Sequence, residues 1–386
     1  MKQQVVKTFS WHPHCKLALL VDAERYLPAM LEAIAEAKQH ILLEMYLVKP
    51  GVLLSCLSLA LQQAAIRGVR CYLLLDDFGS KALQEAEIGN LQHDNILIRR
   101  YNPLTSYSSL VSLYRLLWQR LPQDLRRTHR KLLLIDGQTA FTGGMGICDE
   151  FSEDQFGPWR ETMAIFSGHV VNDWQALFCD SWPEPLTLPQ APRHQLGMVK
   201  CQLTAAYAQH YNPLQQSIGL MCQQVQQRLW LCTAYFVPGW RLRRELIKAV
   251  KRGVDVRLLL PGARIDHPAI RHTSRRLYTR LLRHGVKIYE YQPRFLHTKL
   301  LLCDNKVSMG SSNFDRWGMR WNMEANLQVD STDFADQVAA VMEQDFSQSN
   351  LFDYHRWCQR SWRLRIQENF WGWVSRLLTR LSQRLR

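Results

Sequence analysis

The chain has 386 residues, 47% of them hydrophobic and 21% charged, enough for two or three domains or one large domain built from two halves. The net charge of +14 favours an anionic partner such as nucleic acid, a phosphorylated substrate or an anionic lipid surface. No apolar run reaches the roughly 18 residues of a membrane span, and the first residues lack the apolar core of a signal peptide. The ten cysteines form no Cys-x-x-Cys pair, so we expect buried, reduced thiols and a reducing compartment.

Apolar strands and amphipathic helices alternate through the first hundred residues, which predicts a largely parallel sheet covered by helices. The predicted strands lie at residues 17–21, 41–48, 69–77 and 95–101. Residues 107–121 then place apolar side chains on one helical face, with arginines beside them. Two interpretations remain open for this segment: a core-facing helix, or a flap at the mouth of the site that faces water or a membrane.

The same succession of elements occurs twice along the chain. The segment RGVRCYLLL of the first half returns as RGVDVRLLL in the second, and each half closes with a predicted helix. A proline-rich stretch separates the two copies and is predicted to be a linker. The predicted units are a first half at residues 1–183, a linker at 184–197, a second half at 198–348 and a tail at 349–386.

Each half contains one octet of the form His-x-Lys-x4-Asp. The two octets comprise His129, Lys131, Asp136, His297, Lys299 and Asp304. Side chains alternate along a strand, so the His and Lys of an octet share one face, and the apolar residues that follow predict a buried central strand. The duplication predicts an α/β fold of two pseudo-twofold-related halves. Each half is a mostly parallel or mixed β-sheet flanked by helices, with the active site at their interface.

These residue types suit the cleavage of a phosphodiester. A lysine supplies positive charge to non-bridging phosphate oxygens. One imidazole can attack phosphorus and form a phosphohistidine, while the other protonates the leaving oxygen and then deprotonates the incoming alcohol or water. The aspartate of each octet is expected close to its histidine and lysine. No metal-ligand spacing is visible, so neither a metal nor another cofactor is expected.

The tail differs from both halves in composition. From residue 351 onward it contains eight arginines, no lysine and four tryptophans. From Phe370 onward, apolar residues recur on one helical face and arginines on the other. The tail is therefore either a helix docked on its own domain or an interfacial helix lying on anionic lipid, and the arginine and tryptophan content favours the second.

The paired octets resemble those of the phospholipase D superfamily, and the flanking sequence resembles the bacterial cardiolipin synthases of the B type. The resemblance extends from about residue 17 to residue 346. Besides the octets it rests on the stretches ILLEMYLV, GGMGICDE, TAYFVPGWRLRRELIKAVKRGV, YEYQPRFLHTKLLLCD and GSSNFDRWGMRWNMEANL. It implies that the histidines, lysines and aspartates of both octets are the catalytic residues.

The resemblance also implies four supporting residues. Ser311 and Asn313 match polar residues that border the phosphate, and Glu324, with Glu161 as its counterpart in the first half, matches an acid that orients a motif histidine. Gly146 departs from the family, which often has asparagine at that position. One phosphate contact in the first half is therefore either missing or supplied by a neighbour.

The function implied is that of a cardiolipin synthase. A phosphatidyl group would pass to a histidine, with His129 favoured, and then to phosphatidylglycerol, with phosphatidylethanolamine as an alternative donor. The expected partners are phospholipids and an anionic membrane surface rather than nucleic acid. The expected location is the bacterial inner membrane, bound peripherally. The alternatives are a phospholipase D-type hydrolase, a nuclease of the same superfamily and a non-catalytic membrane-binding protein.

Overall fold

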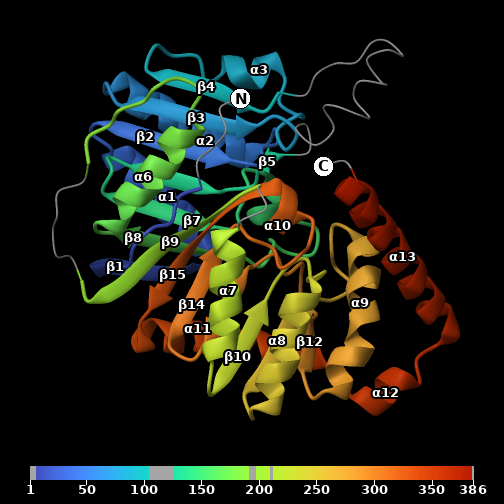
Figure 1. The fold of residues 1–386 in the computed structure, drawn as a ribbon. Helices are drawn as coiled ribbons and strands as arrows, with labels where there is room; N and C mark the ends of the chain where they lie inside the picture. Colours follow the sequence, from blue (N-terminus) through green and yellow to red (C-terminus); the bar gives the residue numbers. More distant parts are fainter. Residues whose placement is uncertain (1–5, 104–125, 191–196, 209–211, 385–386) are drawn as a thin grey trace.

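The computed structural model describes residues 6–103, 126–190, 197–208 and 212–384 (Figure 1). The first half contains β1 (His12–Val21), α1 (Ala23–Glu36), β2 (His40–Met45), α2 (Val52–Ile66), β3 (Arg70–Asp76), α3 (Glu85–Gly89), β4 (Ile96–Tyr101), β5 (Arg127–Thr128), β6 (Leu132–Ile135), β7 (Thr139–Gly143), η2 (Asp149–Phe151), β8 (Thr162–Ser167) and α6 (Val170–Ser181).

The second half repeats this order and adds a C-terminal extension. It contains β9 (Val199–Tyr207), α7 (Pro213–Gln224), β10 (Arg228–Cys232), α8 (Trp240–Lys251), β11 (Asp255–Pro261), α9 (Pro268–Arg283), β12 (Lys287–Tyr291), β13 (Leu300–Cys303), β14 (Lys306–Gly310), α10 (Gly318–Trp321), β15 (Asn322–Asp330) and α11 (Thr332–Ser347). The extension consists of β16 (Ser349–Leu351), α12 (Tyr354–Cys358) and α13 (Trp362–Arg384).

One mixed sheet runs through both halves, and its strand order is symmetric about its centre. From the centre outward, one half reads β1-β8-β7-β6-β2-β3-β4 and the other β9-β15-β14-β13-β10-β11-β12. The central pair, β1 and β9, is antiparallel. In each half the three outer strands of this series are parallel and the others antiparallel. This arrangement confirms the predicted pair of pseudo-twofold-related halves with mixed sheets.

Apolar runs cover both faces of the sheet. All six residues of β2 are buried, which explains its nearly continuous apolar sequence. On one face, Trp174 and Phe178 of α6 and Phe334 of α11 pack in a core that is shared by the two halves. On the other face, α1 and α2 cover the first half, and α7, α8 and α9 lie over the second (Figure 1). The shared core joins the halves into one unit and holds their octet strands in register.

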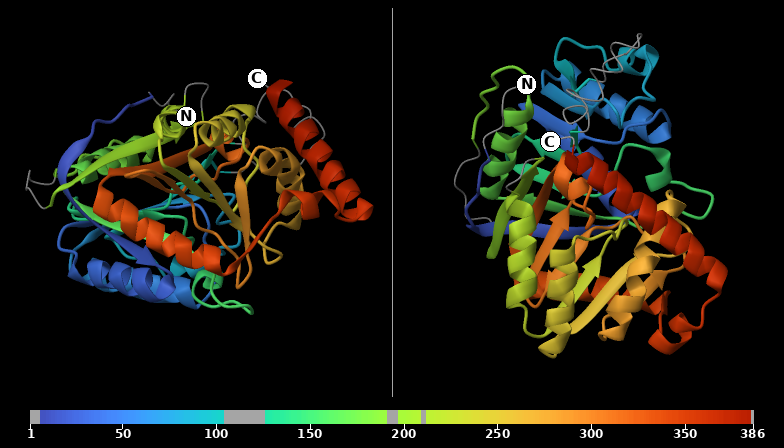
Figure 2. Two further views of the ribbon diagram at one scale, coloured as in Figure 1. Left: turned by 90° about the horizontal axis from the view of Figure 1, so that it is seen from below. Right: turned by 45° about the vertical axis from the view of Figure 1, so that its right-hand side comes forward.

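The beginning of the tail belongs structurally to the second half. Strand β16 pairs antiparallel with β12, and Trp357 is 3% exposed within the core of that half. Helix α13 begins at Trp362, earlier than the predicted Phe370, and runs beside α9 (Figure 2). Within the described part of the chain, no helix has the length and apolar character needed to cross a bilayer. Residues 107–121 lie outside the described residues, whereas residues 184–190 of the predicted linker form neither helix nor strand.

Candidate active site

Backbone pairing between the halves brings the two octets together. Strand β5 pairs in parallel with β15, and the amide of His129 donates to the carbonyl of Met323 at 2.9 Å. The other half repeats this contact, because the amide of His297 donates to the carbonyl of Arg160 at 2.9 Å. The backbone of each histidine therefore lies against the backbone of the other half. This geometry places both rings at the interface of the halves.

The carboxylate that orients each histidine also comes from the opposite half. Nδ1 of His129 lies 3.0 Å from Glu324 on β15, and Nδ1 of His297 lies 2.7 Å from Glu161, which directly precedes β8. Both glutamates are buried, with 1% and 0% exposure. A carboxylate on Nδ1 holds the ring in place and leaves the other nitrogen, Nε2, available for chemistry.

The two lysines lie against the histidine of their own octet. Nζ of Lys131 donates to the carbonyl of His129 at 2.7 Å, and Nζ of Lys299 donates to the carbonyl of His297 at 2.5 Å. Burial lowers the pKa of Lys131 to about 7 and also lowers the pKa of Lys299. A bound phosphate would favour the charged form of both groups, so these lysines are suited to hold an anion.

The two histidine–carboxylate pairs are not equivalent. Ser311 donates its hydroxyl to Glu324 at 2.5 Å, whereas Gly144 occupies the corresponding position beside Glu161. A Cβ on Gly144 would lie 2.2 Å from the Glu161 carboxylate, so no side chain fits there. Burial raises the pKa of Glu161 to about 7. Burial opposes ionisation of Glu324 as well, but His129, Lys131 and Ser311 outweigh it and lower the pKa of that group.

Burial also determines the charge of the histidines. Burial lowers the pKa of His129, and the nearby Glu324 raises this pKa and so offsets part of the shift. The pKa of His297 is lowered further, by burial and then by the positive charges of Lys299 and Lys131. Both rings are therefore neutral near pH 7. A neutral imidazole has a free lone pair on one nitrogen, which a nucleophile requires, and a proton on the other, which it can give up only if a neighbouring acid protonates the first nitrogen.

The aspartates of the octets lie away from the histidines, so the prediction that they are close is wrong. Asp136 follows β6, at the end opposite His129, and accepts three hydrogen bonds from the amides of residues 38–40 at 2.8–2.9 Å. Asp304 accepts the equivalent bonds from the amides of residues 226–228 at 2.8–3.0 Å. Both adopt positive φ, 54° and 52°. They fix the turn that follows each octet strand and do not contact the candidate reacting atoms.

Asn313 and Gly146 make the two sides of the site different. Asn313 is 5% exposed, lines the cavity, and its Oδ1 has no hydrogen-bond partner in the described structure. At the equivalent point of the first half, a Cβ on Gly146 would lie 2.9 Å from Cβ of Leu47. The asparagine expected from the resemblance would therefore clash in this chain. Among the described residues that line the cavity, side-chain amides come from the second half alone.

Both histidines open into one cavity of about 770 Å³. Lys131 and Asn313 also line it, together with Trp371 and Val374 of α13. The remaining lining is rich in aromatic and aliphatic side chains, among them Tyr46, Phe78, Phe151, Trp159, Tyr235 and Ile270. The arrangement is a polar centre within a largely apolar chamber, which suits a phosphodiester that carries apolar groups.

Comparison with known proteins agrees with this geometry. The family model described as "Cardiolipin synthase, PLD-like domain" matches residues 30–174 and 221–346. The chain belongs to this phospholipase D-like family. A cardiolipin synthase of Geobacillus thermodenitrificans is 31% identical over 381 residues, covering 94% of this chain and 72% of that protein. Cardiolipin synthase B of Salmonella typhi is 32% identical over 359 residues, covering 88% of this chain and 83% of that protein.

A solved structure shows the same fold at low identity. The phosphatidylserine synthase of Haemophilus influenzae Rd KW20 superposes with a TM-score of 0.70 and 13% identity, covering 95% of this chain and 94% of that one. The fold is thus shared over 95% of this chain.

Sequence reasoning missed the aromatic residues around the two rings of this phospholipase D-like site. Tyr46 lies edge-on to His129 with ring centroids 4.8 Å apart. Phe151 and Trp159 lie 5.2 and 5.3 Å from the ring of His297, and Tyr235 lies 6.4 Å from it. Two signals were available in the sequence, because Trp159 stands two residues before Glu161 and Tyr235 lies in one of the stretches that resemble the family.

Proposed function

We propose that this protein is a phosphatidyltransferase that forms cardiolipin from phosphatidylglycerol. The observation that carries the proposal is the pair of buried histidines, each held by a carboxylate of the other half, opening with Lys131 into one cavity. The names of the relatives support the same activity. A cavity of about 770 Å³ with an apolar lining is compatible with a phospholipid headgroup and the first part of its chains.

In the first step, Nε2 of His129 attacks the phosphorus of the donor lipid. The ionised Glu324 accepts a hydrogen bond from the Nδ1–H group of His129. This bond keeps the proton on Nδ1 and leaves the lone pair on Nε2. The P–O bond to the headgroup breaks as the P–N bond forms, and His297 gives its Nε2 proton to the leaving oxygen. The proton of Glu161 moves to Nδ1 of His297 at the same time, so the ring stays neutral and Glu161 becomes ionised until the second step reverses this transfer. Lys131 and Asn313, which line the cavity, stabilise the charge on the non-bridging oxygens, and Lys299 adds positive charge from beside His297.

The inequality of the glutamates supports this division of roles. A protonated Glu161 donates to Nδ1 of His297, which places the ring proton on Nε2, where a general acid needs it. In the second step, the hydroxyl of phosphatidylglycerol attacks the phosphohistidine and gives its proton to His297. The P–N bond breaks, cardiolipin leaves and His129 returns to its neutral form. With phosphatidylglycerol as donor, the other product is glycerol.

We also propose that α13 holds the site against an anionic membrane. Trp362, Ile366, Phe370 and Trp373 recur at helical spacing and are 54–66% exposed. Arginines at 363 and 365 are exposed beside them, and further arginines follow in the sequence. Aromatic and cationic side chains together suit the headgroup region of a bilayer. Because Trp371 and Val374 line the catalytic cavity, lipid would reach the site beside this helix. The location would be peripheral, at the inner membrane of a bacterium.

The proposal is tested by giving the purified protein vesicles of labelled phosphatidylglycerol and separating the lipid products by thin-layer chromatography. Cardiolipin should form, and H129A and H297A protein should form none. A matched arm with phosphatidylethanolamine tests whether that lipid also serves as donor. Phosphatidic acid as the sole product would show a hydrolase instead, and activity on DNA without activity on vesicles would show a nuclease.

A further inference from the structure

Four arginines surround a second cavity beside the catalytic one. Arg243 of α8, Arg276 and Arg280 of α9, and Arg316 of the segment between β14 and α10 line a space of about 260 Å³. The other lining residues are Val237, Pro238, Thr273, Leu277 and Gly372. No carboxylate is among them. We refer to this space as the arginine cavity.

Three of the four arginines of this cavity have no acidic partner in the described part of the protein. Arg243, Arg280 and Arg316 form no ion pair with any acid of the described residues. Nε of Arg243 is buried without a hydrogen-bond partner. The sequence after Glu368 contains no acidic residue, so the rest of α13 brings no carboxylate.

Two other arginines of low exposure in this chain are paired with acids. Arg160 lies 3.0 Å from Asp345, and Arg275 lies 3.5 Å from Glu290. In the arginine cavity, by contrast, burial lowers the pKa of Arg243, and the charges of Arg316, Arg280 and Arg276 lower it further. Gathering like charges in a partly desolvated place is unfavourable unless an anion binds there. Guanidinium groups bind phosphate oxygens through paired hydrogen bonds, so a phosphate is the anion that this arrangement fits.

The arginine cavity adjoins the site of chemistry. Val237, Thr273 and Arg316 line both it and the cavity that contains the two histidines. Helix α13 reaches the arginine cavity at Gly372. A Cβ on this glycine would lie 2.4 Å from Cδ of Arg276, so the absence of a side chain leaves room for Arg276 against the helix. The same helix lines the catalytic cavity with Trp371 and Val374. A molecule lying between the two cavities would therefore remain beside α13.

We propose that the arginine cavity binds the phosphate of the acceptor phospholipid while its glycerol hydroxyl attacks the phosphohistidine. This inference rests on the proposed function. In that reaction two phosphates must end on one glycerol, so the enzyme needs a second phosphate site next to the first. Transfer to water or to free glycerol has no such need, since neither carries a phosphate. The arginine cavity would thus select a phospholipid as acceptor, by binding its headgroup in position for attack.

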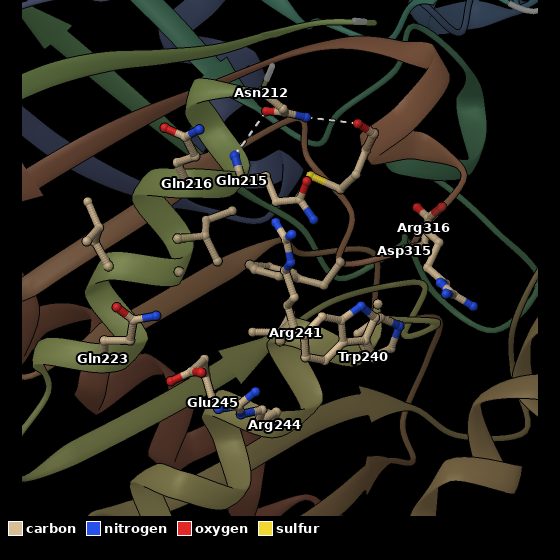
Figure 3. A pocket seen from close by; sticks show the side chains of 18 of the residues that line it. Asn212, Gln215, Gln216, Gln223, Trp240, Arg241, Arg244, Glu245, Asp315 and Arg316 are labelled. Carbon is tan, nitrogen blue, oxygen red and sulfur yellow. Dashed lines mark hydrogen bonds between the residues drawn. The ribbon is translucent and has the colours of Figure 1, made fainter. Parts of the chain in front are cut away.

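A larger cavity nearby is less suited to this role. It occupies about 960 Å³ between α7 and α8 and is also lined by Arg316 (Figure 3). Arg241 and Arg244 of α8 share its walls with the carboxylates of Glu245 and Asp315, and Lys248 lies 3.0 Å from Glu245. Glutamines of α7 form its other side (Figure 3). Two carboxylates therefore line this larger cavity, whereas none is among the lining residues of the arginine cavity.

The test compares two acceptors with one donor. Vesicles of phosphatidylglycerol and phosphatidylcholine supply the donor. Cardiolipin formation reports transfer to phosphatidylglycerol, and incorporation of radiolabelled glycerol into phosphatidylglycerol reports transfer to an acceptor without phosphate. In the double variant R243Q/R280Q we expect cardiolipin formation to fall about tenfold or more, because charge-assisted hydrogen bonds to a phosphate are lost. Glycerol incorporation should stay within about twofold of the wild-type rate, since the phosphohistidine still forms.

Two further variants and one binding measurement keep the result interpretable. R280Q alone changes an exposed side chain and should show the same selective loss, at smaller size, if the double variant folds poorly. R70Q/R283Q removes two exposed positive charges that line neither cavity and should leave both reactions unchanged. Cosedimentation with the vesicles should be equal for all variants.

The outcomes separate this inference from the proposed function. A selective loss of cardiolipin formation supports the acceptor site. Equal loss of both reactions, or a loss that parallels weaker vesicle binding, overturns it, because the arginines would then act on the donor or on bulk lipid. If wild-type protein incorporates glycerol but forms no cardiolipin, the proposed function itself fails, and the wild-type arm alone shows this.

Discussion

The sharpest prediction concerns the two glutamates that hold the histidines. Glutamine keeps the shape of a protonated glutamic acid but cannot ionise, so each Glu→Gln change fixes one carboxyl in its neutral form. At pH 6, Glu161 with a pKa of about 7 is ionised in about one molecule in eleven. The pKa of Glu324 is lowered, so this group is ionised at the same pH. The same substitution therefore leaves the resting charge at Glu161 nearly unchanged and removes a charge at Glu324.

The expected magnitudes follow from this difference. At pH 6, E324Q should lower kcat/KM for cardiolipin formation about a hundredfold or more, because a nucleophilic His129 needs the negative charge as its ring becomes positive. E161Q should lower it less, by about tenfold, because glutamine still holds the His297 ring with its proton on Nε2 but cannot replace that proton through Nδ1. Between pH 6 and 8 the protonated fraction of wild-type Glu161 falls about tenfold, so the ratio of E161Q to wild-type activity should rise about tenfold. The E324Q ratio should stay flat across this range.

Initial rates with labelled phosphatidylglycerol at pH 6, 7 and 8 measure these ratios. Trapping of the protein by an alkaline quench, with the label in the phosphate of the donor lipid, shows whether the loss in E324Q precedes the phosphohistidine, because its P–N bond survives in alkali. If E161Q were the more damaged variant at pH 6, or if both ratios were independent of pH, the assignment of His129 as nucleophile and His297 as proton donor would be refuted. Equal thermal unfolding of both variants at pH 6 is the control for misfolding.

Three further predictions concern stability. D304N should lower the free energy of unfolding by about 1–3 kcal/mol in urea titrations and change kcat by less than about threefold, because Asp304 binds three backbone amides and no reacting atom. G146N should lower it by about 1–3 kcal/mol without raising activity, because its Cβ meets Leu47 at 2.9 Å; an active, equally stable variant would contradict this. Burial raises the Glu161 pKa above its unfolded value to about 7, so the folded state binds this proton more tightly and is favoured at low pH. Stability should therefore fall by about 3 kcal/mol as the pH rises from 4.5 to 7, and E161Q should lack this component of the slope.

The octet aspartates show which positions in the fold can be predicted from the spacing of residues along a strand. Four residues of β6 separate the histidine and lysine from Asp136, and a strand advances about 3.3 Å per residue. The aspartate therefore lies at the far end of the strand, so this position follows from the sequence once the strand is assigned. The positive φ and the three amide bonds do not, because they depend on the loop that precedes β2.

The sequence by itself determined the duplication, the mixed α/β halves and the chemistry of the two octets, because these depend on residue types and on periodicities within single elements. Only the tertiary structure decided that each glutamate serves the histidine of the other half, since pairing between distant strands places them. It likewise decided that Ser311 supports Glu324 while Gly144 leaves Glu161 without a hydroxyl. The four arginines of the arginine cavity come from two helices and a loop, and their spacing in the chain follows no period. Long-range packing alone brings their charges together.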